Sequence, residues 1–526
     1  MRILLTIIFS AAVSMAQHQH VSKPEPDITL YKGLGGWHHP VATKSPEAQK
    51  YFDQGLILLY SFNKHESIRS FQKAAQLDPT MPMAYWGLAA AYGPYINMDI
   101  DPDYRLKDSC DAVLSGLKLS NINEVEKRWL QAAQTRCPDF GDPSAYIASM
   151  KSLANDFPDD PDAQAFYAEA LMIPIRWRWY SNGQPSPGER EAEQIIESVL
   201  RRYPQHPGAN HLYIHAVESS PTPERAIPSA QRLMGITPMA GHMVHMPGHI
   251  WLVTGDYEAA ANVNERAAQV DRDLFARNGI HLAYYMYYLH NLTFITYARG
   301  MQGRVEEGNA AARELQQAIA DVMQDMPDAA VMAGPAIDVL LRNQQWNAVL
   351  AMPKPDAAAH PALAFWHFSR ALGFQGKHEK TLAAAEQEAF EVERKLVDPE
   401  IHAGNNAMGP ILSLASAVIV ARLSGAVDDW KKAVAIQDSL VYDEPPPFFY
   451  PVRESLGAAL LRSGDAPAAE QVFRDGLLRT PRNGRMLFGL LESLKAQHKT
   501  EAAAWVESEF EQAWSKATLT LRIEDL

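Results

Sequence analysis

Histidines gather near the middle of the chain at spacings that suit metal binding. In the stretch GHMVHMPGHIWLVTG (241–255), His242, His245 and His249 fall at positions i, i+3 and i+7. If this stretch is helical, the three imidazoles lie on one face of the helix. Neutral imidazole is a ligand for zinc, copper and nickel. The spacing therefore predicts a helix face that binds a metal ion or carries a catalytic site.

A second pair of histidines precedes this stretch at a fixed interval. The segment ANHLYIHAVE (209–218) contains His211 and His215, which stand 34 residues before the last two histidines of the first stretch. Two histidines at i and i+4 can chelate one ion from one helical face. Glu218 ends the segment and is a candidate base for activating a metal-bound water.

The same residues have an interpretation without metal chemistry. Histidines that line a groove can hydrogen-bond a bound peptide, and Met243 and Met246 can pack in the core. If they turn inward, the two methionine sulfur atoms would instead favour copper. The chain contains no H-E-x-x-H protease motif. The pattern leaves both a metal groove and a peptide-binding groove open.

Pairs of helices are expected to position these side chains. Within residues 51–79, small residues, an aromatic residue and a proline recur at fixed intervals: Gly55, Ser67, Phe71, Ala74 and Pro79. Small residues let two helices approach closely, the aromatic ring fills the space between units, and proline ends the second helix. No strand pattern stands out, so the sequence predicts an all-α protein.

These units resemble tetratricopeptide repeats over most of residues 46–514, with degenerate stretches at 99–136 and 278–352. Phrases such as MAYWGLAAAYGPYIN, HMPGHIWLVTGDYEAA and DEPPPFFYPVRESLGAALL are also similar to a group of exported bacterial tetratricopeptide proteins of unassigned activity. The resemblance implies a right-handed α-solenoid of helix–turn–helix units, in which the first helices line a concave groove.

Aligned to such units, several polar residues take groove positions: His211, His215, His242, His245, His249 and His290, with Glu218 and Arg299 deeper in the groove. Pro247 departs from the family pattern because it lies inside the aligned first helix. Proline removes a backbone hydrogen bond there, which predicts either a kink or a helix that begins only at Pro247.

The start of the chain predicts export. Arg2 precedes an apolar run, and small residues stand before an expected cleavage after Ala16, as in a secretory signal peptide. The apolar run is too short to span a membrane, and no later stretch is long and apolar enough to do so. We expect a periplasmic or secreted protein with no membrane span.

The expected division of the chain follows these features. It comprises a signal peptide (1–16), an extended arm (17–45), an N-terminal solenoid with the histidine-rich groove (46–300), degenerate helical repeats (301–445) and C-terminal units with a cap (446–526).

The net charge and the cysteines indicate which partners and which covalent bonds to expect. The net charge of −14 argues against nucleic acid, because phosphate binding needs a basic surface. Export permits a disulfide between Cys110 and Cys137. If these residues lie on adjacent antiparallel helices that turn near Ser120, they stand at different heights, which disfavours the bond. No C-x-x-C-H haem motif is present.

Other residues suggest ligand contacts outside the histidine helices. Trp177 and Trp179 alternate with arginines, which suits an anionic or aromatic ligand, although packing between helices explains them as well. Arg453 can clamp a carboxylate or hold the proline-rich loop before it. The pair His38-His39 can complete a site from the arm or form an ordinary surface pair.

The sequence favours a protein- or peptide-binding scaffold in the cell envelope, because stacked helix pairs make long binding surfaces. The alternative is a metalloprotein with copper or zinc in the histidine cluster and oxidative or hydrolytic activity. A structural adaptor in an envelope assembly is a third possibility. The metal, substrate, partner and oligomeric state are left open by the sequence.

Overall fold

The computed structural model describes residues 26–97, 105–120, 122–325, 332 and 334–526. The expected signal peptide and the first part of the expected arm lie outside the described residues. From residue 26 to the first helix the chain has no helix or strand. Gln54 holds this segment on the first helix, since its side chain accepts from Tyr31 N at 2.7 Å and donates to Thr29 O at 3.0 Å.

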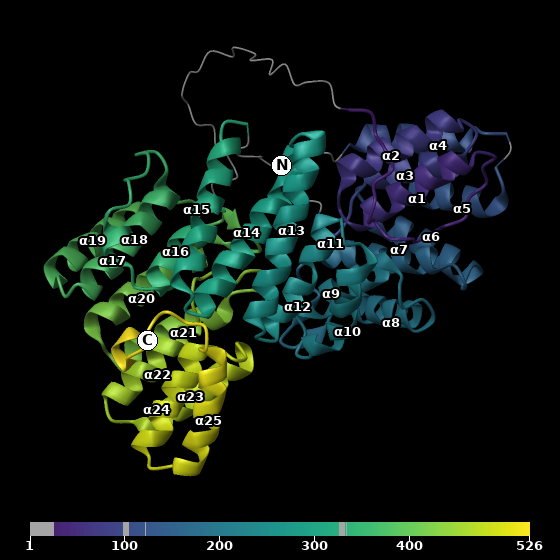
Figure 1. Cartoon of the computed structure of the whole chain (residues 1–526). Coiled ribbons are helices and arrows are strands. Elements are labelled where there is room, and N and C mark those ends of the chain that lie inside the picture. The colour runs from purple at the N-terminus through teal and green to yellow at the C-terminus, as the bar shows by residue number, and fades with distance from the viewer. Residues whose placement is uncertain (1–25, 98–104, 121, 326–331, 333) are drawn as a thin grey trace.

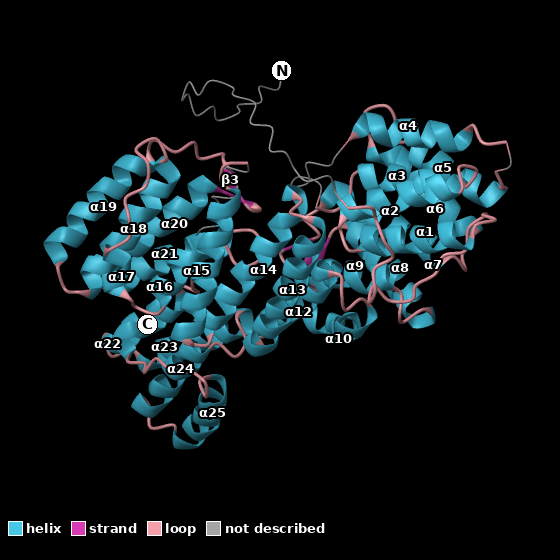
Figure 2. Ribbon diagram, turned by 45° about the horizontal axis from the view of Figure 1, so that its top comes forward, coloured by secondary structure: helices cyan, strands magenta, loops and turns pink. Residues whose placement is uncertain are grey.

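The described chain is mostly helical, with loops between the helices (Figure 2). Its first half contains α1 (Pro46–Tyr60), α2 (Lys64–Leu77), α3 (Pro82–Tyr92), α4 (Leu106–Leu117), α5 (Glu124–Gln134), α6 (Pro143–Asp156), α7 (Pro161–Met172), α8 (Pro187–Arg202), α9 (Pro207–Glu218), α10 (Ile227–Ile236), α11 (Gly241–His245), α12 (Pro247–Val253) and α13 (Tyr257–Asn278). The second half contains α14 (Leu282–Met301), α15 (Val305–Val322), α16 (Gly334–Arg342), α17 (Trp346–Leu350), α18 (His360–Gly376), α19 (Lys380–Arg394), α20 (Met408–Ser424), α21 (Val427–Ser439), α22 (Arg453–Arg462), α23 (Ala466–Arg479), α24 (Gly484–Ala496) and α25 (Thr500–Ala513).

Strands among the described residues are limited to two short antiparallel pairs. They are β1 (Tyr180–Ser181) with β2 (Gln184–Pro185), and β3 (His402–Ala403) with β4 (Asn406–Ala407). No described helix combines the length and the apolar character that crossing a bilayer requires. The all-α prediction is confirmed.

The helices pack as consecutive pairs, and the predicted small and aromatic residues explain how. Phe71 of α2 is fully buried between Gly55 of α1 and Gly87 of α3. A Cβ atom at either glycine would stand 2.7 Å or less from the Phe71 ring. The aromatic residue of one unit therefore fills the space that glycines of its own unit and the next leave open.

The same packing recurs near the other end of the chain, where Phe473 of α23 lies between Gly457 of α22 and Gly489 of α24. Figure 1 shows the helix pairs following one another from α1–α7, through α9–α14 in the middle, to α17–α25. The architecture is a tetratricopeptide-like helical solenoid.

The C-terminal repeats pack against helices from the middle of the chain. The Tyr257 hydroxyl of α13 donates to Pro481 O at 3.2 Å, and the Trp514 ring covers Gly303 so closely that a Cβ there would lie 2.5 Å from it. The loop between α21 and α22 is thereby held near α12, where it reaches the histidines described below.

The expectation against a Cys110–Cys137 disulfide is wrong, because the two residues are bonded and their Cα atoms lie 5.8 Å apart. The expectation assumed that Cys137 continues a straight helix. In the structure α5 ends at Gln134, and Cys137 lies in the following turn, where its N–H donates to Gln134 O at 3.0 Å. The turn brings it to the level of Cys110 on α4.

Candidate metal centre

Three parts of the solenoid bring the six predicted histidines together. His211 and His215 lie on α9, His242, His245 and His249 on the α11–α12 segment, and His290 on α14. Every residue of α9 is buried, because this helix packs against α1, α7, α8, α10 and α12.

Pro247 divides the predicted first helix without separating its histidines. Met246, between α11 and α12, keeps helical dihedral angles (φ −50°, ψ −39°), and Pro247 starts α12 at a position where its missing N–H is tolerated. Gly248 lets α12 lie against α13, since a Cβ there would stand 2.5 Å from Asn264 Nδ2. The kink therefore leaves the imidazoles on one side of the segment.

The histidines form two adjacent groups of three. His211, His215 and His242 make the first, and His245, His249 and His290 the second; within each group one ring nitrogen per residue lies within 4.8 Å of the others. Ring centroids of His215 and His249 are 5.4 Å apart, which places the two groups side by side.

The outer nitrogens of four rings are held by fixed acceptors. His211 Nδ1 donates to Tyr60 O and His245 Nδ1 to Asn264 Oδ1, both at 2.6 Å. Glu218 accepts from Nδ1 of His215 at 3.0 Å and of His249 at 2.5 Å. A carbonyl or carboxylate oxygen can only accept, so it places a ring proton on Nδ1, and in a neutral ring this leaves the lone pair on Nε2.

These Nε2 atoms point at one another. The Nε2 atoms of His245 and His249 are 2.6 Å apart, and those of His211 and His242 are 3.2 Å apart. His215 Nε2 is buried and has no hydrogen-bond partner among the described residues. A short Nε2–Nε2 contact needs either a proton on one of the two nitrogens or a cation between them, because two facing lone pairs repel.

The protonation states suit a metal centre. Burial and neighbouring imidazoles hold the pKa of His211, His242 and His245 well below the usual value. Burial lowers the pKa of His215 and His290 to about 3. Neutral imidazole is the form that binds a metal ion.

Two buried glutamates complete the cluster. Glu218 ends α9, and Glu444, from the loop before α22, forms an ion pair with His249 Nδ1. Burial lowers the pKa of His249, but these two carboxylates together raise it to about 10, so this ring would have to release its second proton on binding a metal ion. Burial and the charge of Glu218 raise the pKa of Glu444 to about 7.

Glu444 was not among the predicted site residues. It belongs to the DEPPPFFYP phrase, far from the histidines in sequence, and no periodicity links it to them. An acidic residue directly before three prolines in a loop was the available signal, and it does not specify a partner.

Aromatic rings surround the imidazoles. Trp177 and Trp179 lie with their ring centroids 6.1 and 6.0 Å from that of His215. Phe62 lies 4.4 Å from His211, and Phe294 lies 4.8 Å from His245. These rings keep water from the cluster and strengthen electrostatic interactions inside it.

The remaining predicted residues lie elsewhere. Arg299 is buried on α14 and pairs with Glu258 at 3.0 Å and Glu265 at 2.8 Å. Arg453 clamps the Asp438 carboxylate of α21 through two bonds of 2.6 Å. Met243 and Met246 are fully buried in the largest apolar core, as expected from the packing interpretation: both are 0% exposed.

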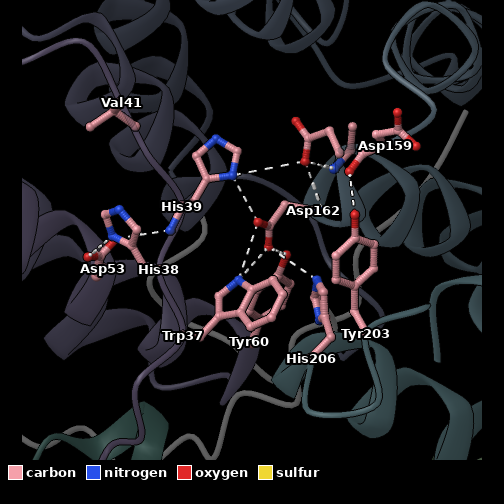
Figure 3. A network of polar contacts seen from close by, with 12 residues as sticks. Trp37, His38, His39, Val41, Asp53, Tyr60, Asp159, Asp162, Tyr203 and His206 are labelled. Carbon is pink, nitrogen blue, oxygen red and sulfur yellow. Dashed lines mark hydrogen bonds and ion pairs between the residues drawn. The ribbon is translucent and has the colours of Figure 1, made fainter. Parts of the chain in front are cut away.

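The arm histidines belong to a separate network around Asp162 (Figure 3). The Asp162 carboxylate accepts from His39 Nδ1 at 2.8 Å, Trp37 Nε1 at 3.1 Å and the Tyr60 hydroxyl at 2.5 Å. His206 Nε2 lies 3.2 Å from it. His38 instead pairs with an aspartate of α1. Asp162 is saturated by these donors, so the network docks the arm on the first helix pairs.

No protein-family model matches the chain, and no curated protein does. Solved structures of distant similarity include yeast Tom70, with 11% identity over 88% of this chain and 90% of that chain at a TM-score of 0.28. The human IFIT1 dimer with m7Gppp-AAAA shows 12% identity over 90% of this chain and 91% of that chain, at a TM-score of 0.33. The Cut9–Hcn1 hetero-tetramer of the APC/C shows 12% identity over 90% of this chain and 76% of that chain, at a TM-score of 0.31. Likenesses this distant carry no argument about ligands, and the similarity to exported bacterial proteins stays a prediction.

Proposed function

We propose that the chain is a metalloprotein in which the two histidine groups each bind one transition-metal ion, zinc or copper. The observation that carries this proposal is the orientation of the imidazoles. The Nδ1 protons of four of them are held outward by Tyr60, Asn264 and Glu218, while their Nε2 atoms converge on the interior of the cluster. Acceptors on the outer nitrogen are the usual device that orients histidine ligands in metal sites.

Three imidazoles per ion leave a coordination position for water or substrate, as in catalytic sites. A metal ion there would activate a bound water or polarise a substrate, which makes a hydrolytic or oxidative reaction the proposed activity. Glu218 is committed to two imidazoles, so its role is to orient them. Glu444 is the carboxylate that the C-terminal repeats add beside His249.

The burial of the histidines supports this function over peptide binding by the same residues. His211, His215, His242, His245 and His249 are at most 4% exposed. An extended peptide in a groove cannot reach side chains enclosed to this degree. The solenoid fold nevertheless fits a protein-binding scaffold on its other surfaces, and co-purification of one partner from envelope extracts would test that second function.

We also propose that the protein functions outside the cytoplasm. The Cys110–Cys137 disulfide supports this location, because such bonds persist in oxidising compartments. The expected signal peptide agrees with it but lies outside the described residues.

Elemental analysis of protein exported and purified without a histidine tag tests the metal centre. We expect about two ions per chain, and about one after His245→Ala/His249→Ala or after His211→Ala/His242→Ala. His498→Ala, at an exposed histidine, is the control and should keep both. Absence of metal after loading with zinc and with copper, in protein whose circular dichroism shows it folded, would contradict the proposal.

A further inference from the structure

A cavity of about 780 Å³ lies beside the histidine cluster. It is lined by Pro94, by the turn and helix start at 136–146, by the end of α7 with the chain that follows it (170–178), and by the β3–β4 hairpin at 402–405, with Val441 beside the hairpin. Sites for small organic ligands have volumes of roughly 300–1,000 Å³. The cavity is therefore large enough for a substrate.

The cavity and the candidate metal centre share a wall. Trp177 lines the cavity, and its ring centroid is 6.1 Å from that of His215. Arg136 and Tyr146 line both this cavity and a smaller one of about 20 Å³ that reaches His211. Val441 stands three residues before Glu444 in the same loop. A ligand in contact with Trp177 would thus be one aromatic ring away from His215.

The charges of the lining favour an anion. Arg136, Arg176 and Arg178 line the cavity, against one carboxylate, that of Asp142. Asp142 caps α6 and accepts from Ser144 N at 2.8 Å, so its charge is directed to its own helix. This positive lining stands out in a chain whose net charge is −14. Guanidinium groups bind carboxylate and phosphate oxygens through paired hydrogen bonds.

The aromatic side chains of the cavity wall favour an anionic ligand that also has a planar or apolar part. Trp177 and Tyr146 form part of the wall, and the Arg136 guanidinium lies 3.5 Å from the Tyr146 ring centroid. Arg136 already covers Tyr146, so a ligand ring would contact Trp177, with the neighbouring guanidinium groups beside it.

We propose that this cavity binds an aromatic organic anion, a carboxylate or a phosphate ester, beside the proposed metal centre. The neighbouring metal rests on the proposed function, while the binding itself depends on residues that hold no metal. Arg176 and Arg178 would bind the anionic group, and Trp177 would hold the ring against the wall nearest His215.

Calorimetric titration with benzoate, phenylphosphate and neutral benzamide tests this inference. We expect one of the two anions to bind at least tenfold more tightly than benzamide, and the stronger one identifies the anionic group. Arg176→Gln should weaken its binding about tenfold, a typical loss for one charge-assisted contact. Arg178→Gln, at an exposed position, should weaken it less and is safe for folding.

The control is Arg190→Gln on α8, which is exposed and does not line the cavity; it should leave binding unchanged. Three results would overturn the inference: benzamide binds as tightly as the anions, neither anion binds, or neither cavity variant weakens binding. Metal analysis of the same samples separates the two proposals. Full metal content without anion binding refutes the cavity site alone, whereas missing metal with intact anion binding refutes the metal centre alone.

Discussion

Four imidazoles of the cluster use their two nitrogens differently, and this division is visible at the level of single residues. The acceptors on Nδ1 come from a backbone carbonyl, an amide and a carboxylate, at Tyr60, Asn264 and Glu218. Asn264 is itself oriented, because its Nδ2 donates to Ala260 O at 2.8 Å. Its Oδ1 is therefore fixed as the acceptor from His245.

Replacing Asn264 tests whether these acceptors matter for metal binding. Asn264→Ala removes the acceptor of His245 and should lower metal affinity 10- to 100-fold, the usual cost of losing such a partner. Asn264→Asp restores an acceptor oxygen and should recover part of the affinity. Competition with a chelator of known affinity measures the effect; equal affinity of Asn264→Ala and the unchanged protein would show that the contact does not orient a ligand.

At the scale of elements, the α11–α12 segment depends on close approach to α13. Two glycines allow it: a Cβ at Gly241 would clash with the Asp271 carboxylate, and one at Gly248 with the Asn264 amide. The kink at Pro247 is tolerated because both halves of the segment rest on α13 at these points.

Gly248→Ala should therefore destabilise the fold and disturb the site together. The added methyl group would stand 2.5 Å from Asn264 Nδ2, and overpacking of this kind costs about 1–3 kcal/mol. Gly235→Ala in α10 is a matched control, because nothing lies within 4 Å of the added Cβ and alanine is favoured in a helix. Urea unfolding measures both variants; similar stabilities would show that α12 can move away from α13.

The docking of the arm on the first helix pairs depends on the charge of Asp162. Burial raises the pKa of this carboxyl, but hydrogen bonds from His206 and His39 more than offset burial and hold it well below its usual value. Conversely, burial lowers the pKa of His39, but its bond to Asp162 raises it above the usual value.

The stability that this pair contributes should depend on pH in a defined way. The Asp162 contribution is present above the unfolded pKa of about 3.9 and is lost as pH falls through the lowered folded pKa. The His39 contribution is present below the unfolded pKa of about 6.5 and is lost as pH rises through the raised folded pKa. Asp162→Asn should therefore cost most between about pH 4 and 6.5, by roughly 3–5 kcal/mol. Urea unfolding of both proteins from pH 3 to 9 measures this difference; a cost independent of pH would refute the charge-based account.

At the scale of the whole molecule, the disulfide ties α4 to the turn after α5 at one end of the solenoid, where α3, α4 and α5 pack together. Cys110→Ser/Cys137→Ser should lower stability by roughly 2–4 kcal/mol, since it frees a loop of 27 residues in the unfolded chain. Metal content should stay unchanged, because neither cysteine belongs to the histidine cluster. Thermal unfolding with and without a reductant, alongside metal analysis, checks both expectations, and loss of metal in the variant would contradict the second.

Local patterns in the sequence were enough to determine the helical class, the glycine–aromatic packing of the repeats and the helices that carry the histidines. These features arise from residues a few positions apart or one repeat apart, so the period of the sequence encodes them. His211 and His245, for example, are one repeat apart, and stacking of neighbouring units brings their helices together.

Tertiary structure alone decided the features that depend on segments distant in sequence. Glu444 reaches His249 because the C-terminal repeats fold back on α13 and hold its loop there. The disulfide forms because the turn after α5 brings Cys137 to the level of Cys110, and helix periodicity does not predict where the chain goes in a turn. Such contacts depend on how the chain bends between units, and bends are set by the packing of the whole solenoid, whereas the repeat pattern specifies only each unit and its neighbours.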